Sequence, residues 1–107
     1  MFVKTANDKN INQLLASEKP VLLKLGATWC GPCKTIKPVL ESLAEDRKET
    51  LLVYDMDIDD NPEASQSFHI MGVPTVILFS NGREVSRKSG NMSRPILEDW
   101  IDSELKK

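Results

Sequence analysis

Residues 21–33 read VLLKLGATWCGPC, and this stretch decides the fold. Its first half is an almost continuous apolar run, which is typical of a strand that a sheet buries on both faces. Its second half ends in two cysteines, Cys30 and Cys33, separated by a glycine and a proline. Apolar residues then recur at helical spacing as far as about Arg47, so we expect the cysteines where a strand ends and a helix begins.

The rest of the chain repeats the pattern of a strand followed by a helix. Strands are predicted at residues 2–5, 21–26, 51–57, 76–79 and 84–88, and helices at residues 7–19, 30–47, 61–68 and 93–105. Strands separated by helices pair in parallel, whereas the turn Asn81-Gly82 predicts an antiparallel hairpin. The predicted fold class is therefore α/β, with the order βαβαβαββα and a central mixed sheet that carries helices on both faces.

Several single residues support the predicted helix boundaries. Asn7, Asn61 and Ser93 are residue types that cap helix N-termini, and Pro62 stands at a first helical turn, where proline is favoured. Pro38 interrupts the second helix and is expected to bend it, because proline supplies no N–H to the helical ladder.

Composition indicates an ordinary globular chain. The 107 residues are 40% hydrophobic and 28% charged, which suits one domain, residues 1–107, around one core. The formal charge of −2 disfavours a nucleic-acid partner, which needs a basic surplus on one face. No apolar run approaches the roughly 18 residues of a membrane span, and the N-terminus lacks the apolar stretch of a secretory signal. We therefore expect a cytoplasmic monomer.

The position of the cysteines predicts thiol chemistry. Unpaired N–H groups and the positive end of the helix dipole stabilise an anion at a helix N-terminus. Cys30 is expected to be exposed there with a lowered pKa and to attack a substrate disulfide, while Cys33, one turn further and more enclosed, resolves the mixed disulfide. Gly31 and Pro32 keep the turn tight, and Pro32 removes one amide donor, which favours a reducing protein.

A metal site is the main alternative for such a cysteine pair. Zinc takes four ligands, and the chain offers only His69 as a further nitrogen or sulfur ligand, so no metal is expected. The carboxylates between Asp55 and Asp60 do not form a calcium loop either. Counted from Asp55, the sixth residue is not glycine, and the twelfth is Gln66 instead of glutamate.

The segment ATWCGPCK at residues 27–34 resembles the thioredoxin family. The match extends over nearly the whole chain: Pro38 within KTIKPVLESLA, DMDIDDNP at residues 55–62, GVPT at residues 72–75, FSNG at residues 79–82, and Gly90. The combination of WCGPC with a downstream GVPT is highly specific for this family. The resemblance therefore implies the thioredoxin fold.

The resemblance also implies partners and site residues. It implies a protein-disulfide reductase without a bound cofactor, which acts on disulfide-containing proteins and receives electrons from NADPH through a thioredoxin reductase. Pro74 is implied to be a cis-proline that faces the disulfide and, with the Val73 backbone, holds an extended substrate segment. The implied contact surface around Cys30 consists of Trp29, Gly72, Val73, Pro74, Gly90 and Asn91.

Two positions depart from the family pattern. Gly26 stands where many thioredoxins have an aromatic residue, and Lys24 stands where the family normally places a buried aspartate beneath the cysteines. The third strand often carries a lysine in thioredoxins, and here it carries Asp55. Lys24 and Asp55 are therefore predicted to meet beneath Cys33 as an inverted pair that takes part in proton transfer and makes the protein more oxidising. The alternative is that Lys24 extends to solvent and Asp55 is merely exposed.

Three functions stay open at this point. The first is a general protein-disulfide reductase, and the second is a specialised redox protein that serves one partner with an altered potential. The third is a binding module that uses the same surface without redox turnover. Insulin reduction by dithiothreitol separates the first two from the third, and activity with a thioredoxin reductase separates the first from the second.

Overall fold

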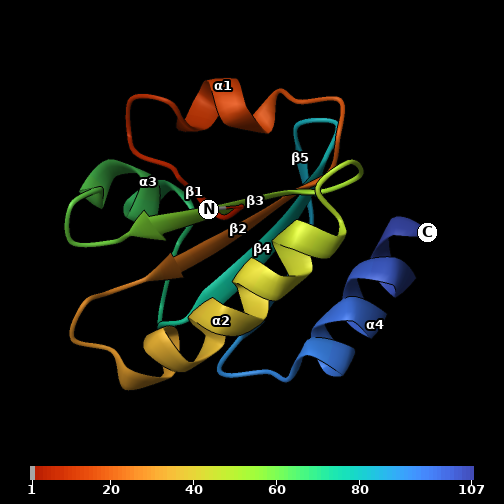
Figure 1. The fold of residues 1–107 in the computed structure, drawn as a ribbon. Coiled ribbons are helices and arrows are strands. Elements are labelled where there is room, and N and C mark those ends of the chain that lie inside the picture. Colours follow the sequence, from red (N-terminus) through yellow and green to blue (C-terminus); the bar gives the residue numbers. More distant parts are fainter. Residues whose placement is uncertain (1) are drawn as a thin grey trace.

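The structure is a computed structural model, and it describes residues 2–107. Five strands form one sheet in the order β1-β3-β2-β4-β5 (Figure 1). The elements are β1 Lys4–Thr5, α1 Ile11–Leu15, β2 Val21–Gly26, α2 Gly31–Asp46, β3 Leu52–Asp57, α3 Pro62–Ser67, β4 Thr75–Ser80, β5 Arg83–Ser89 and α4 Arg94–Leu105. β1, β3 and β2 run parallel, whereas β4 is antiparallel to β2 and to β5. The predicted mixed α/β sheet and its element order are confirmed.

Helices cover both faces of the sheet, with α2 and α4 on one face and α1 and α3 on the other (Figure 1). Side chains alternate along a strand, so β2 contributes to two separate cores. Leu22 packs with apolar residues of α2 and α4, while Leu23 and Leu25 pack with residues of α1 and α3. Lys24 has the same parity as Leu22 and therefore lies on the α2 face.

The hairpin between β4 and β5 forms at the predicted turn. Asn81 and Gly82 both have positive φ values, 55° and 79°. A two-residue turn of this kind requires positive φ at both positions, which asparagine and glycine tolerate best. The local sequence therefore determines this antiparallel edge.

The first helix differs from the prediction. It begins at Ile11 after Asn10, not after Asn7, and it ends at Leu15. The Asn7 side chain instead accepts hydrogen bonds from the backbone N–H groups of Lys9 and Asn10, both at 2.9 Å. A turn therefore occupies residues 7–10, and the helix is correspondingly shorter.

That turn is fixed by contacts with α3. The backbone N–H of Asp8 donates to the Asn61 side chain at 2.9 Å, and the Asp8 carboxylate accepts from the Ala64 N–H at 2.8 Å. Asn61 occupies the N-cap position of α3 as predicted, but its side chain makes no capping bond. A carboxylate from a distant segment therefore satisfies an amide at this helix end.

Helix α2 is continuous through Pro38, and charged side chains tie it to α4. Arg47 donates to both carboxylate oxygens of Asp102, at 2.6 and 3.0 Å. Arg94 pairs with Asp46 and Glu98. The bidentate hydrogen bond from Arg47 holds the pKa of Asp102 below its usual range.

Replacing Asp102 with asparagine is expected to lower the free energy of unfolding by about 0.5–1 kcal/mol at pH 7, because the pair is largely solvent-screened. A carboxyl whose pKa is depressed by folding stabilises above its unfolded pKa of about 3.9, and loses that contribution as pH falls through the folded value. The difference from wild type should therefore vanish near pH 2. Urea unfolding at both pH values measures it, with Asp99→Asn on the same helix as control. An equal difference at both pH values would contradict the prediction.

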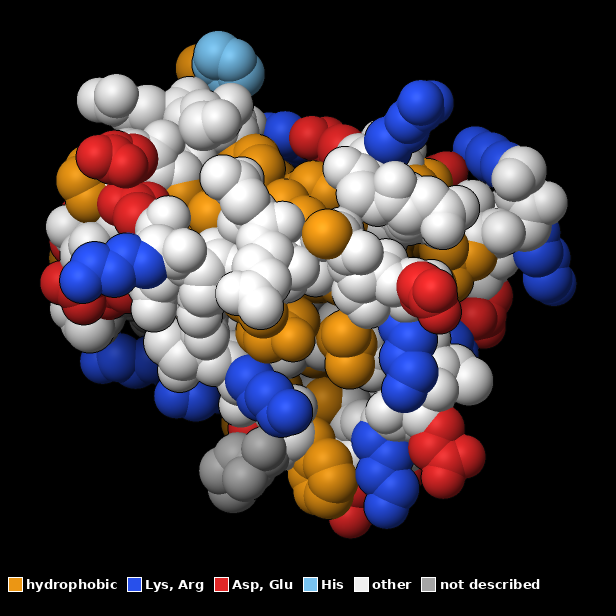
Figure 2. All heavy atoms as spheres, turned by 90° about the horizontal axis from the view of Figure 1, so that it is seen from above, with side chains coloured by type: hydrophobic (Ala, Val, Ile, Leu, Met, Phe, Trp, Pro, Cys, Tyr) orange, Lys and Arg blue, Asp and Glu red, His pale blue; other side chains and the backbone are white. Residues whose placement is uncertain are grey.

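The surface carries charges of both signs. Seen from the α1 side, basic and acidic side chains are interspersed around the rim, and uncharged side chains occupy much of the centre (Figure 2). This distribution is consistent with the formal charge of −2. Among residues 2–107, no helix is both long and apolar enough to cross a membrane.

Candidate active site

The two cysteines lie at the start of α2, shortly after the buried strand β2. Cys30 is the N-cap residue, with extended backbone, and its Sγ accepts a hydrogen bond from the backbone N–H of Cys33 at 3.2 Å. The two residues form a disulfide, with their Cα atoms 5.3 Å apart. Because the unpaired amides of a helix begin here, the geometry favours negative charge on the Cys30 sulfur once the disulfide opens.

Cys30 is less accessible than the sequence predicted. Its exposed fraction is 5%, against 2% for Cys33. Ala27, Ile58 and Val73 pack around the pair. The prediction of an exposed Cys30 was therefore wrong for the disulfide form, because residues that follow β3 and precede β4 cover it.

The loop before β4 lies against the disulfide. The Val73–Pro74 bond is cis, as predicted, and Val73 packs against the cysteines. The backbone N–H of Gly90 donates to the Pro74 carbonyl at 2.9 Å, and the Thr75 hydroxyl donates to the Gly72 carbonyl at 2.7 Å. These bonds connect the loop to β4 and to the end of β5, so four of the predicted contact residues, Gly72, Val73, Pro74 and Gly90, belong to one connected backbone region.

Exposed side chains border this region. Trp29 is 68% exposed and Met71 is 98% exposed, the two highest values among the large apolar side chains described. Asn91 is exposed and lines a shallow hollow with Thr35 of α2. The predicted surface therefore lies around the cysteines, and the part of each residue in substrate binding stays a prediction.

Asp59 is a site residue that sequence reasoning missed. The sequence assigns it no role in the site, but its carboxylate accepts a hydrogen bond from the Trp29 indole N–H at 2.8 Å. The turn that presents it is held by Asp57, whose side chain accepts from the backbone N–H groups of Asp59 and Asp60. The sequence signal was the Asp-x-Asp spacing after a strand, which predicts such a turn but not its distant partner.

Replacing Asp59 with alanine is expected to raise KM for a protein disulfide about fivefold and to leave kcat nearly unchanged. A hydrogen bond of this kind contributes about 1 kcal/mol, which corresponds to about a fivefold change in an equilibrium constant. Here the bond restrains the exposed Trp29 ring on the contact surface. Insulin reduction over a range of insulin concentrations measures both constants, with Asp60→Ala as the matched control. A change in kcat alone would show that the bond serves the chemistry instead of substrate contact.

Lys24 and Asp55 meet, as the sequence predicted. The two residues are directly paired in register between β2 and β3, and Lys24 Nζ lies 3.3 Å from Asp55 Oδ1. Lys24 is 5% exposed, whereas the Asp55 side chain is 29% exposed. The alternative in which Lys24 extends to solvent is therefore wrong. An unpaired ammonium at this depth would be costly, and the nearby carboxylate offsets that cost.

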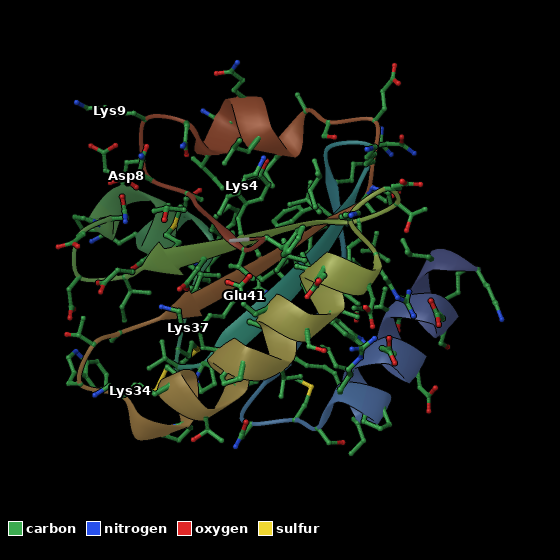
Figure 3. All side chains as sticks on the ribbon, in the orientation of Figure 1. Lys4, Asp8, Lys9, Lys34, Lys37 and Glu41 are labelled. Carbon is green, nitrogen blue, oxygen red and sulfur yellow. A yellow bond between two sulfur atoms is a disulfide. The ribbon has the colours of Figure 1, made fainter. Side chains whose placement is uncertain are left out.

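A hollow of about 350 Å³ connects this pair with Cys33. Cys33, Lys24, Gly26 and Asp55 are among the residues that line it, together with Thr5, Ala27, Thr28, Lys34, Lys37, Met56 and Asp57. Lys34 and Lys37 extend from α2 on the side of the β2 carboxyl end (Figure 3). The Lys24–Asp55 pair and Cys33 therefore border one space that opens to solvent.

The structure does not bring possible metal ligands together among the residues it describes. His69 is exposed just after α3, and its φ is 55°. Met56 is fully buried in the core. Across residues 2–107, no group of three or more histidine, cysteine, aspartate or glutamate side chains is arranged to hold a metal ion.

Comparison with known proteins shows which family and which proteins this chain is similar to. A family model described as Thioredoxin matches residues 2–103. A thioredoxin of Mycobacterium tuberculosis is 41% identical over 95 residues, which cover 89% of this chain and 82% of the relative. A thioredoxin of Alicyclobacillus acidocaldarius is 42% identical over 94 residues, 88% of this chain and 90% of the relative. A bifunctional thioredoxin reductase/thioredoxin of Mycobacterium leprae is 44% identical over 90 residues, 83% of this chain and 20% of the relative.

Proposed function

This chain belongs to the thioredoxin family and is a thiol-disulfide oxidoreductase, and we propose that Cys30 is its attacking thiol and Cys33 its resolving thiol. The observation that carries the proposal is the hydrogen bond from the Cys33 N–H to Cys30 Sγ at the start of α2. An amide that already points at this sulfur stabilises it as a thiolate, which is the reactive form. The Cys33 sulfur lies one turn further into the helix.

The reaction is two successive thiol-disulfide exchanges. The Cys30 thiolate attacks one sulfur of a substrate disulfide, that bond breaks, and the other substrate sulfur leaves as a thiolate. Cys33 then loses its proton and attacks Cys30 Sγ, which breaks the mixed disulfide and releases the second substrate thiolate. The substrate has gained two electrons, and the chain is left with the Cys30–Cys33 disulfide.

Lys24 and Asp55 are proposed to serve the second exchange. The Asp55 carboxylate accepts the Cys33 proton, directly or through a water in the hollow, and the Lys24 ammonium stabilises the thiolate as it forms. Both side chains line the hollow together with Cys33, and Asp55 is open enough to exchange its proton with solvent. Gly31 and Pro32 tune the pair by keeping the turn between the cysteines tight.

Substrate is proposed to bind across Trp29 and the loop before β4. Gly72 is exposed and Val73 is half-buried against the cysteines, and an extended segment of a partner can form hydrogen bonds with this backbone. Gly90 and Asn91 complete this surface, as the resemblance implied, whereas Pro74 is buried and supports the loop from within.

Electrons are proposed to come from NADPH through a thioredoxin reductase, with no cofactor bound to this chain. The fusion of the two activities named in the Mycobacterium leprae relative supports a reductase partner. A disulfide reductase is useful where thiols are kept reduced, so the proposed location is the cytoplasm. We propose that the chain works there as a single-domain monomer over residues 1–107.

The test is a coupled assay with purified NADPH-dependent thioredoxin reductase and insulin. NADPH consumption, followed at 340 nm, is expected to require the reductase, insulin and this chain together, and to disappear with Cys30→Ser. If dithiothreitol drives insulin reduction but NADPH and reductase do not, the proposed electron source is wrong. That result would favour a specialised redox protein, which the inverted Lys24–Asp55 pair would then explain.

A further inference from the structure

Gly26 ends β2 beside Lys24 and Cys33. A β-carbon at this position would lie 3.0 Å from Lys24 Cε, 3.2 Å from Lys24 Nζ and 3.1 Å from Cys33 Sγ. Carbon atoms in van der Waals contact are about 3.5–4.0 Å apart. Any other residue at this position therefore requires the end of the lysine side chain or the sulfur to move away by a few tenths of an ångström.

The two neighbours differ in how easily they can move away. Cys33 is fixed by α2 and by its disulfide, whereas the last carbons of a lysine turn freely about several bonds. A side chain at residue 26 would therefore displace the ammonium before it displaced the sulfur. We propose that Gly26 is the positioning residue of the inverted pair, because its missing side chain lets the Lys24 ammonium lie beside Cys33 Sγ. This inference rests on the proposed role of Lys24 and Asp55.

Several charged side chains surround the Cys33 sulfur, and they differ in how strongly each affects the Cys33 thiolate. Asp55 and Asp57 face the hollow from β3, and Lys34 and Lys37 face it from α2, where both lysines are exposed. Lys24 is the buried cation among them and the one in contact with the space beside the sulfur. A buried charge is screened less by salt and water than an exposed one. Moving the Lys24 ammonium should therefore have the largest effect on the Cys33 thiolate.

The sign of the effect follows from which state the ammonium stabilises. A cation beside Cys33 stabilises the thiolate of the reduced protein and has no thiolate to stabilise in the disulfide, so it makes the protein more oxidising. Gly26→Ala should therefore shift the equilibrium with glutathione about five- to tenfold toward the disulfide form. The pH midpoint for alkylation of Cys33 by iodoacetamide in the reduced protein should rise in parallel.

The experiment compares Gly26→Ala in two backgrounds of the full chain, the native pair and the neutral pair Lys24→Met/Asp55→Leu. Alanine is expected to shift the glutathione equilibrium and the alkylation midpoint only in the native background. Equal shifts in both backgrounds, or no shift in the native one, would overturn the proposal. If Gly26→Ala folds only in the neutral background, the lysine is the residue that excludes the side chain, as proposed. If it folds in neither, the sulfur or backbone excludes it and the proposal is wrong.

A separate measurement distinguishes failure of the Gly26 proposal from failure of the proposed cysteine roles. Insulin reduction driven by dithiothreitol is measured on the wild-type chain in parallel, because it needs the cysteine pair but not Gly26. Turnover without a Gly26 effect overturns this inference alone, whereas absence of turnover overturns the roles of the cysteines themselves.

Discussion

Replacing Cys33 with serine is expected to convert the chain into a trap that stays joined to its substrates through Cys30. The Cys30 thiolate keeps the amide environment at the start of α2, so the first exchange proceeds. Serine cannot attack the mixed disulfide, so the second exchange is lost and catalytic turnover falls by orders of magnitude. The reduced variant is incubated with proteins whose disulfides are intact. Non-reducing gel electrophoresis followed by mass spectrometry then identifies the joined cysteine.

Cys30→Ser is the matched control for this trap. It should form no lasting mixed disulfide and should show no turnover, because the attacking thiol is gone while the fold keeps its buried contacts. The two single variants therefore separate attack from resolution. If Cys30→Ser captures substrates and Cys33→Ser does not, the order of attack is reversed.

Breaking the Lys24–Asp55 pair is expected to have the largest effect on stability. Asp55→Leu leaves the almost fully buried Lys24 without its partner, which should cost about 3 kcal/mol. Lys24→Met should cost less, about 1–2 kcal/mol, because the Asp55 carboxylate borders the hollow and can be hydrated. Urea unfolding measures both variants, and the exchange Lys24→Asp with Asp55→Lys should recover much of the loss.

The exposed pair between Glu84 and Arg87 provides the comparison. It is a closer ion pair, at 2.7 Å, but Glu84→Gln should cost less than about 1 kcal/mol because solvent screens both groups. A double-mutant cycle on Lys24 and Asp55 should give a coupling free energy well above that value. A coupling near zero would show that the two charges meet in the structure without stabilising one another.

The alternation of side chains explains why the sequence could predict the ion pair. Successive residues of a strand face opposite sides, and paired parallel strands carry matched positions on one face. Lys24 and Asp55 stand at corresponding points of two apolar strands, so the resemblance and the strand pattern together predicted their meeting. The register between β2 and β3 confirms it, and it also places Gly26 on the same face.

Contacts between turns could not be predicted in the same way. The Trp29–Asp59 hydrogen bond joins two loops, and the Asp8–Ala64 bond joins a turn to a helix end 56 residues later. No periodic pattern links such positions, because the geometry of each loop depends on how the elements around it pack. For the same reason, the sequence predicted an exposed Cys30, whereas Ile58 and Val73 cover it in the structure.

The most direct test of the account is the reduction of insulin disulfides by dithiothreitol in the presence of catalytic amounts of the chain. The precipitation of the free insulin B chain should accelerate in proportion to the amount of protein, with many turnovers per molecule, and Cys30→Ser should abolish the acceleration. A rate equal to that of dithiothreitol alone, with a folded chain whose Cys30–Cys33 pair is reduced, would contradict the account.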